Sequence, residues 1–133
     1  MSHSDDPNRG LEAGRARRCA ILGAAHVDKA EQGASDFTAE FKSLITRYAW
    51  NEIWTRPGLP DETRRLLVLA FAIAMGRWEE FDLHFRAALQ HGVSRATLKE
   101  VLLQSAVYCG VPAANTAFHR AQGILDSLDR AAP

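Results

Sequence analysis

Cysteine is scarce in this chain of 133 residues. The two cysteines, Cys19 and Cys109, lie far apart and form neither a C-x-x-C pair nor the framework of a disulfide-stabilised secreted domain. The first ten residues, MSHSDDPNRG, carry acidic groups where a secretory signal needs basic ones. Both features favour a reducing compartment, and we expect a cytoplasmic protein.

An excess of either charge is also missing. Sixteen basic and sixteen acidic residues cancel, which argues against a nucleic-acid or anionic-membrane binder. The longest apolar run, residues 66–75, is too short to span a bilayer. No cluster of His, Cys, Asp and Glu has metal-ligand spacing. We therefore expect no metal, no nucleic acid and no membrane among the partners.

The apolar residues, 47% of the chain, suffice for a single domain over residues 1–133. Their period is helical nearly everywhere, without internal repeats or a strand pattern. We therefore predict an all-α domain of about six helices. Residues 1–9 are expected to be a flexible tail and residues 10–34 a helical arm, with a helix over 11–22 and a link over 26–34.

Caps and breakers delimit the other five helices. Ser35 or Asp36 begins one with an apolar face, and Asp61 begins another that should be central and buried. Ser94 is a natural N-cap, and Gly110 with Pro112 ends the helix that Ser94 begins. These signals predict helices from residue 36 to about 48, and over residues 61–75, 79–90, 94–109 and 112–128.

Residues 47–59, RYAWNEIWTRPGL, hold three large aromatic residues in a segment that we expect to be short and irregular. Trp50 and Trp54 lie at helical spacing, and they serve either as a packing anchor or as the wall of a pocket. In the second case Arg47 or Arg56 would supply a guanidinium that binds an anion.

The helix over residues 94–109 places polar groups within an apolar pattern. Glu100, Gln104 and Tyr108 are spaced by four residues and share one stripe. A buried carboxylate needs a partner or a shifted pKa, so Glu100 is a candidate catalytic residue. The alternative is a solvated Glu100 at the helix edge. Tyr108 is either a core ring or part of the site.

Two histidines are further candidates. His84 shares the apolar stripe of its helix with Phe81 and Phe85, where an imidazole is either a core residue or a catalytic group. His119 lies four residues after Asn115, on a stripe that faces either solvent or Glu100.

Three phrases together resemble a known family: RYAWNEIWTRPGL, GRWEEFDLHFRAALQHG and EVLLQSAVYCGVPAANTAFH. They are similar to the carboxymuconolactone decarboxylase family, within the alkylhydroperoxidase D-like superfamily, over about residues 47–125. The resemblance implies an alkylhydroperoxidase D-like helical fold and a homo-oligomer, either a trimer or a hexamer.

The activity that this resemblance implies is that of a carboxy-lyase. The enzyme would convert 4-carboxymuconolactone to 3-oxoadipate enol-lactone and carbon dioxide in protocatechuate catabolism, the β-ketoadipate pathway. Its partner is then a small lactone dicarboxylate. No cofactor is required, in agreement with only three lysines for Schiff-base chemistry.

The reaction needs a stabilised lactone oxyanion and a proton delivered to the ring. We assign catalysis to His84, Glu100 and His119: one imidazole donates the proton, the other stabilises the oxyanion, and Glu100 orients an imidazole and raises its pKa. The sequence leaves open which histidine is the acid and whether a neighbouring subunit completes the site. Since two carboxylates call for cations beside aromatic walls, the substrate-binding candidates are Arg47, Trp50, Arg77, Trp78 and Tyr108.

Two other readings remain. The superfamily has a peroxidase branch in which C-x-x-C thiols lie between a Glu and a His, but those thiol positions read Pro112 and Asn115 here. A peroxide-handling protein is therefore one alternative, and a non-enzymatic helical interaction protein of the same fold is the other.

Overall fold

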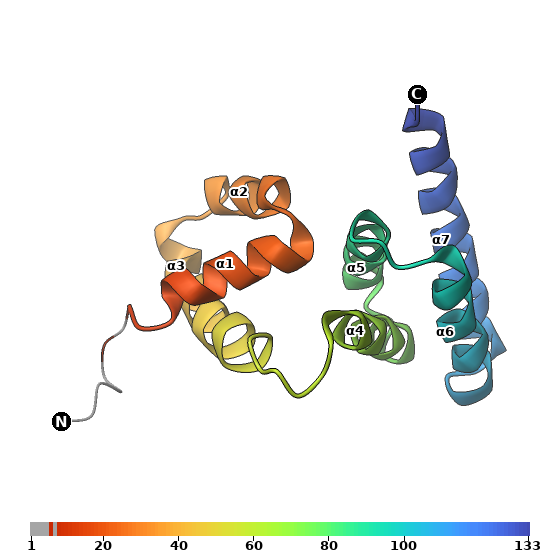
Figure 1. Cartoon of the computed structure of the whole chain (residues 1–133), viewed down its shortest axis with the longest axis horizontal. Helices are drawn as coiled ribbons and strands as arrows, with labels where there is room; N and C mark the ends of the chain where they lie inside the picture. Colours follow the sequence, from red (N-terminus) through yellow and green to blue (C-terminus); the bar gives the residue numbers. More distant parts are fainter. Residues whose placement is uncertain (1–5, 7) are drawn as a thin grey trace. The chain divides into compact units, whose positions relative to one another are not determined.

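The computed structural model describes residue 6 and residues 8–133. Over these residues its regular structure is entirely helical, with seven α-helices and one π-helix, so the all-α prediction is confirmed. The elements in chain order (Figure 1) are α1 (Leu11–Leu22), α2 (Ala24–Gln32), α3 (Asp36–Ile45), η2 (Thr46–Ile53), α4 (Asp61–Met75), α5 (Trp78–Gln90), α6 (Arg95–Tyr108) and α7 (Val111–Ala131).

The chain forms two compact units, an N-terminal unit of residues 1–59 and a C-terminal unit of residues 60–133. The single domain over residues 1–133 stays a prediction. Most of the tail predicted over residues 1–9 lies outside the described residues. No helix in the described part is long and apolar enough to cross a membrane.

The first helix of the N-terminal unit, α1, has the predicted bounds, but the link predicted over residues 26–34 is wrong. These residues belong mainly to α2. Gly23 has a φ of 92°, which ends α1 and lets the chain turn at once into the next helix. The sequence AAHVDKAEQ is rich in good helix formers. Gly23 and Gly33 therefore mark the two ends of this helix.

The segment after α3 is also more regular than predicted. α3 begins at a capping box in which Thr38 Oγ1 accepts a hydrogen bond from Ser35 N at 3.0 Å. It continues into the π-helix η2, where Trp54 N donates to Ala49 O, five residues back. The Trp50 and Trp54 rings stack with centroids 5.2 Å apart. Residues 47–53 are thus helical, and the irregular segment is confined to the turn before α4.

The packing of α1 on η2 depends on Gly14, which is buried. A Cβ at this position would lie 2.9 Å from Thr46 Cγ2 and closer still to the Thr46 carbonyl oxygen, which is backbone and cannot rotate away. We expect Gly14→Ala to destabilise the protein by about 1–3 kcal/mol through overpacking, measured by urea unfolding. Gly123→Ala is the matched control, because nothing lies near that position in α7 and alanine should stabilise the helix by about 0.5–1 kcal/mol. Equal effects of the two changes would contradict this account.

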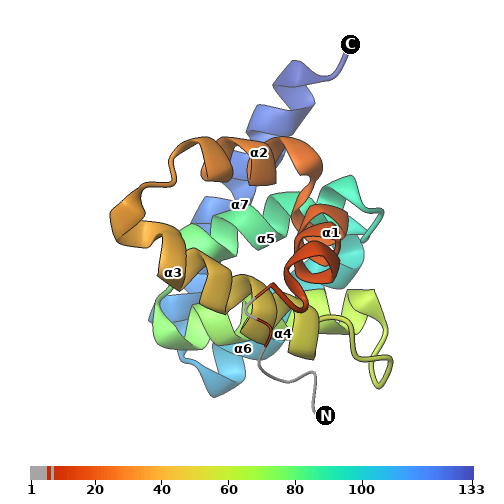
Figure 2. The same ribbon diagram turned by 90° about the vertical axis from the view of Figure 1, so that its left-hand side faces the viewer.

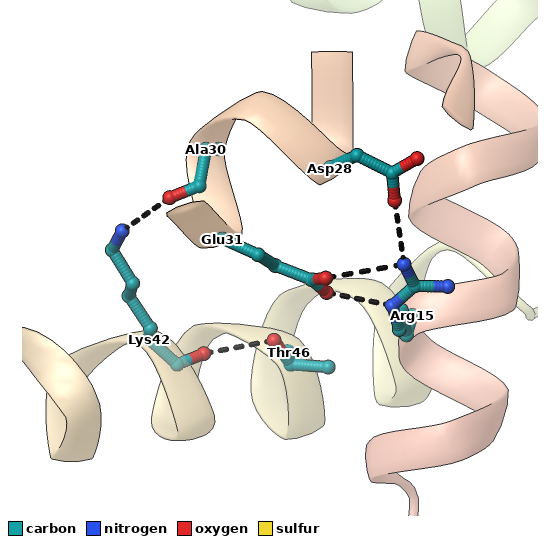
Figure 3. Close-up of polar contacts among 6 residues, drawn as sticks. All are labelled: Arg15, Asp28, Ala30, Glu31, Lys42 and Thr46. Carbon is teal, nitrogen blue, oxygen red and sulfur yellow. Dashed lines mark hydrogen bonds and ion pairs between the residues drawn. The ribbon is translucent and has the colours of Figure 1, made fainter. Parts of the chain in front are cut away.

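A polar network links α1, α2 and α3 (Figure 3). Arg15 Nε donates to Glu31 Oε1 at 2.6 Å, and Arg15 Nη2 donates to Asp28 Oδ1 at 2.8 Å. Lys42 Nζ donates to Ala30 O at 2.8 Å, near the carboxyl end of α2, where a cation is favourable. The N-terminal unit is therefore held by charge-assisted bonds as well as by apolar packing.

The bond from Arg15 lowers the pKa of Glu31 below its ordinary value. A carboxyl with a lowered folded pKa stabilises the fold above its unfolded pKa of about 4.3, and this stabilisation is lost as the pH falls through the folded value. Between pH 6 and pH 3 the wild type should therefore lose more unfolding free energy than Glu31→Gln. The difference will be small because both side chains are about half exposed. A larger loss in Glu31→Gln would contradict the assignment.

The C-terminal unit has its core where α4, α5, α6 and α7 meet. Phe81 and Phe85 of α5 stack with centroids 5.5 Å apart at the centre of the apolar cluster. The buried alanines of α7 allow this helix to approach its neighbours closely. The other buried members of the cluster are Leu69, Ala72, Ile73, Ala88, Val93, Leu98, Leu102, Ala117, Ala121 and Ile124.

The helix bounds in this unit agree closely with the predictions, including the Ser94 cap, whose Oγ accepts from Thr97 N at 3.0 Å. Gly110, with a φ of 95°, lets α6 turn into α7, and the two helices lie side by side (Figure 1). The C-terminal turns of α7 extend beyond the other helices of the unit (Figure 2).

The prediction that α4 is buried is wrong for one face, on which Leu67, Phe71 and Met75 are exposed.

An ion pair joins α5 to α7. Arg120 Nε and Nη2 donate to the two oxygens of Asp82 at 2.9 and 2.7 Å. Arg120 Cζ also lies 6.0 Å from the centre of the Trp78 ring, which meets Phe81 edge to face. This bidentate arrangement fixes the register of the two helices that carry His84 and His119.

Candidate functional site

A groove of about 440 Å³ lies between α4 and α6 in the C-terminal unit. The side chains Leu66, Leu67, Ala70 and Val101 make most of its walls apolar. Its polar lining residues are Thr63, Thr97, Glu100, Gln104, Ser105 and Tyr108. The volume suits a small organic molecule.

The stripe predicted on α6 lines this groove. Glu100, Gln104 and Tyr108 succeed one another by one helical turn and border the same space. The helix displays them because Leu98 and Leu102 occupy its opposite, buried face. Glu100 is exposed rather than buried, and it forms no hydrogen bond or ion pair with any other described residue. Its carboxylate is thus available to a ligand or to another subunit.

The two histidines do not line the groove. His84 is 7% exposed and packs into the α5 face that carries Phe81 and Phe85. His119 is exposed on α7, one residue before Arg120. Glu100 and Tyr108 therefore line the same groove, whereas neither imidazole lines it within this unit.

The remaining predicted residues lie elsewhere. Arg77 is exposed in the turn before α5, and the Trp78 ring packs against Phe81 and Arg120. Arg47 and Trp50 belong to the N-terminal unit, on η2. Arg47 Nε donates to Ser43 O at 3.3 Å, and Arg47 lines a separate hollow of about 370 Å³ together with Arg9. The substrate-binding roles of these four residues stay predictions.

Gln104 is a groove residue that was not selected from the sequence. Its position in the stripe was visible, since it lies midway between Glu100 and Tyr108, but a neutral amide gives no charge signal. Thr63 and Thr97 also line the groove, and only the packing of α4 on α6 reveals them.

An all-helical unit with a small apolar groove, lined by one carboxylate and several neutral polar residues, is typical of the class of proteins that bind a small organic molecule. The model of the carboxymuconolactone decarboxylase family matches residues 39–123. The chain belongs to this family, and the family resemblance seen in the sequence is confirmed.

Known relatives support the same assignment. The chain is 40% identical over 128 residues to 4-carboxymuconolactone decarboxylase of Acinetobacter baylyi, which covers 96% of this chain and 92% of the relative. It is 41% identical over 92 residues to nitrosuccinic acid decarboxylase of Metarhizium robertsii, covering 69% and 64% of the two chains. It is also 43% identical over 44 residues to 4-carboxymuconolactone decarboxylase of Pseudomonas putida, covering 33% and 92%. The prediction of a carboxy-lyase is confirmed.

Proposed function

We propose that this protein decarboxylates 4-carboxymuconolactone to 3-oxoadipate enol-lactone in protocatechuate catabolism. The observation that carries the proposal is the 40% identity to a 4-carboxymuconolactone decarboxylase over nearly the whole of both chains. The groove between α4 and α6 supports it, because its volume fits a five-membered lactone and its walls suit the uncharged ring.

The chemistry needs no redox change. The bond between the ring carbon and its carboxylate breaks, carbon dioxide leaves, and the electron pair spreads through the ring double bond to the lactone carbonyl oxygen. The resulting dienolate takes one proton at the carbon next to the carbonyl. An apolar groove favours the first step, because the carboxylate loses its charge when it leaves as carbon dioxide.

In this proposal Glu100 lies at the reacting centre and His84 or His119 supplies the proton. Glu100 orients the imidazole that it contacts. Because Glu100 has no partner among the described residues and His119 is exposed, we place the imidazole that it contacts on a second copy of the chain. Arg47 and Arg77 are the proposed partners of the substrate carboxylates, beside Trp50 and Trp78.

A homo-oligomer, a trimer or a hexamer of alkylhydroperoxidase D-like subunits in the cytoplasm, is part of the proposal. Large apolar side chains are exposed on α3 and on α4 and α6, which is unusual for a monomer. Among the most exposed are Phe37 at 97% and Val107 at 75%. Subunit contacts would cover them.

The test is to supply 4-carboxymuconolactone and follow both the ultraviolet change and the release of carbon dioxide. The wild type should turn over without any added cofactor, and His84→Ala and His119→Ala should each lower kcat. Near-native rates in both variants together with Glu100→Gln would exclude the assigned roles. No turnover by the wild type would exclude the proposed substrate.

A shared site makes a further prediction. Glu100→Gln and His119→Ala, each slower than wild type alone, should regain part of the wild-type activity when the two chains are co-expressed, because a mixed oligomer contains sites with both native side chains. Light scattering should show an oligomer in every sample. An active monomer, or an oligomer without complementation, would contradict a site shared between copies.

Nitrosuccinate is a second candidate substrate, favoured by the 41% identity to nitrosuccinic acid decarboxylase. Loss of its carboxylate beside the nitro group would leave the charge on the nitro oxygens, so the groove would face the same kind of developing oxyanion. The ratio of kcat/KM for the two acids decides between them, and we expect it to favour the lactone.

A further inference from the structure

The polar residues of the groove between α4 and α6 include a carboxylate and several neutral groups but no cation. No Lys, Arg or His is among the described residues that line it. A lactone dicarboxylate therefore cannot neutralise its charges there. What the groove suits is the uncharged lactone ring, with its carbonyl oxygen inside.

Two of the neutral lining groups have uncommitted donors. Ser105 Oγ already donates to Val101 O, and the Thr97 hydroxyl is bonded to Ser94. The Gln104 amide and the Tyr108 hydroxyl make no hydrogen bond with any other described residue. They lie one helical turn apart on the same stripe and line the same groove.

We infer that Gln104 and Tyr108 form the oxyanion-binding pair of this groove. This inference rests on the proposed function. The Gln104 N–H and the Tyr108 O–H donate to the lactone carbonyl oxygen, and both bonds strengthen as that oxygen gains the electron pair from the broken carbon–carbon bond. The site stabilises this charge with neutral dipoles held on one rigid helix, so neither imidazole is needed for the oxyanion and both are available for proton delivery.

The charge of Glu100 favours a neutral donor at the Gln104 position. Glu100 precedes Gln104 by one turn, and its negative charge borders the same space. A cation at the Gln104 position would form an ion pair with Glu100 and weaken the contact between Glu100 and the imidazole. A neutral amide can stabilise the oxyanion and leave the carboxylate free.

The test separates catalysis from binding. Gln104→Leu and Tyr108→Phe should each lower kcat by roughly 10²- to 10³-fold with KM changed less than about threefold, because the lost bond is strongest in the transition state. Gln104→Glu keeps the shape but removes the N–H, and it should be as slow as Gln104→Leu. The matched controls are Gln90→Leu on α5 and Tyr48→Phe on η2, both exposed and outside the groove, which should keep the wild-type rate.

A ligand probe gives a second readout. Tetronate is a five-membered lactone whose enolate charge is shared with the lactone carbonyl oxygen, so it mimics the dienolate. It should inhibit the wild type competitively, and calorimetry should show at least tenfold weaker binding to Gln104→Leu. A native kcat in Gln104→Leu, or equal tetronate affinity, would overturn the inference while decarboxylation stands. Gln104-dependent tetronate binding without turnover by the wild type would overturn the proposed function alone.

Discussion

Replacement of Glu100 by glutamine is expected to reduce kcat for 4-carboxymuconolactone by roughly 10²- to 10⁴-fold. The change removes the one carboxylate among the described residues that line the groove, and with it the group proposed to hold an imidazole in place. Glutamine has nearly the same shape, so the apolar walls and the neighbouring turn of α6 stay as they are. Steady-state kinetics on the purified variant provide the measurement.

The fold should be unaffected by this change. Glu100 is exposed and makes no bond within the described chain, so its loss should alter the unfolding free energy by less than about 0.5 kcal/mol. Glu80→Gln, an exposed carboxylate of α5 outside the groove, is the control and should keep full activity. An activity of Glu100→Gln within threefold of wild type would mean that the groove carboxylate has no part in the reaction.

Most helix ends were predictable because they depend on local backbone chemistry. Ser94, Gly76 and Gly110 act through caps and through backbone angles that other residues avoid, and none of these effects depends on distant parts of the chain. The same reasoning gave a wrong prediction at α2, where a link was expected, because a glycine that ends one helix can also begin the next. The burial of α4 was predicted wrongly for another reason: apolar residues around the whole helix do not specify which of its faces the neighbouring helices will cover.

The candidate site was predictable only in part. Glu100 and Tyr108 share a stripe because of helical spacing, and the structure places both at one groove. The opposite wall, with Thr63 and Leu66, depends on how α4 packs against α6, which periodicity along one helix does not encode. The relation of His84 and His119 to the groove depends on how α5 and α7 pack against α4 and α6, and the same limit applies.

Phe81→Ala should be the most destabilising of the proposed substitutions, at about 3–5 kcal/mol. Phe81 is fully buried, meets Trp78 edge to face at 5.7 Å and stacks on Phe85, so its removal leaves a cavity bordered by two rings. Since a domain of this size has a total stability of about 5–15 kcal/mol, the loss is a large fraction of it. Urea unfolding measures the effect.

Phe81→Leu is the matched control for this cavity. Leucine keeps much of the apolar volume, so the variant should lose clearly less stability than Phe81→Ala. The change should also affect function, because α5 carries Phe81, Asp82 and His84 within four residues. Loss of the Phe81 ring should loosen the packing of α5 and, with it, the Asp82–Arg120 pair that fixes α5 on α7. Phe81→Ala should therefore lose activity at a lower temperature than wild type, in step with its unfolding. If Phe81→Ala and Phe81→Leu unfolded at the same urea concentration, the ring stack would not be the centre of this core.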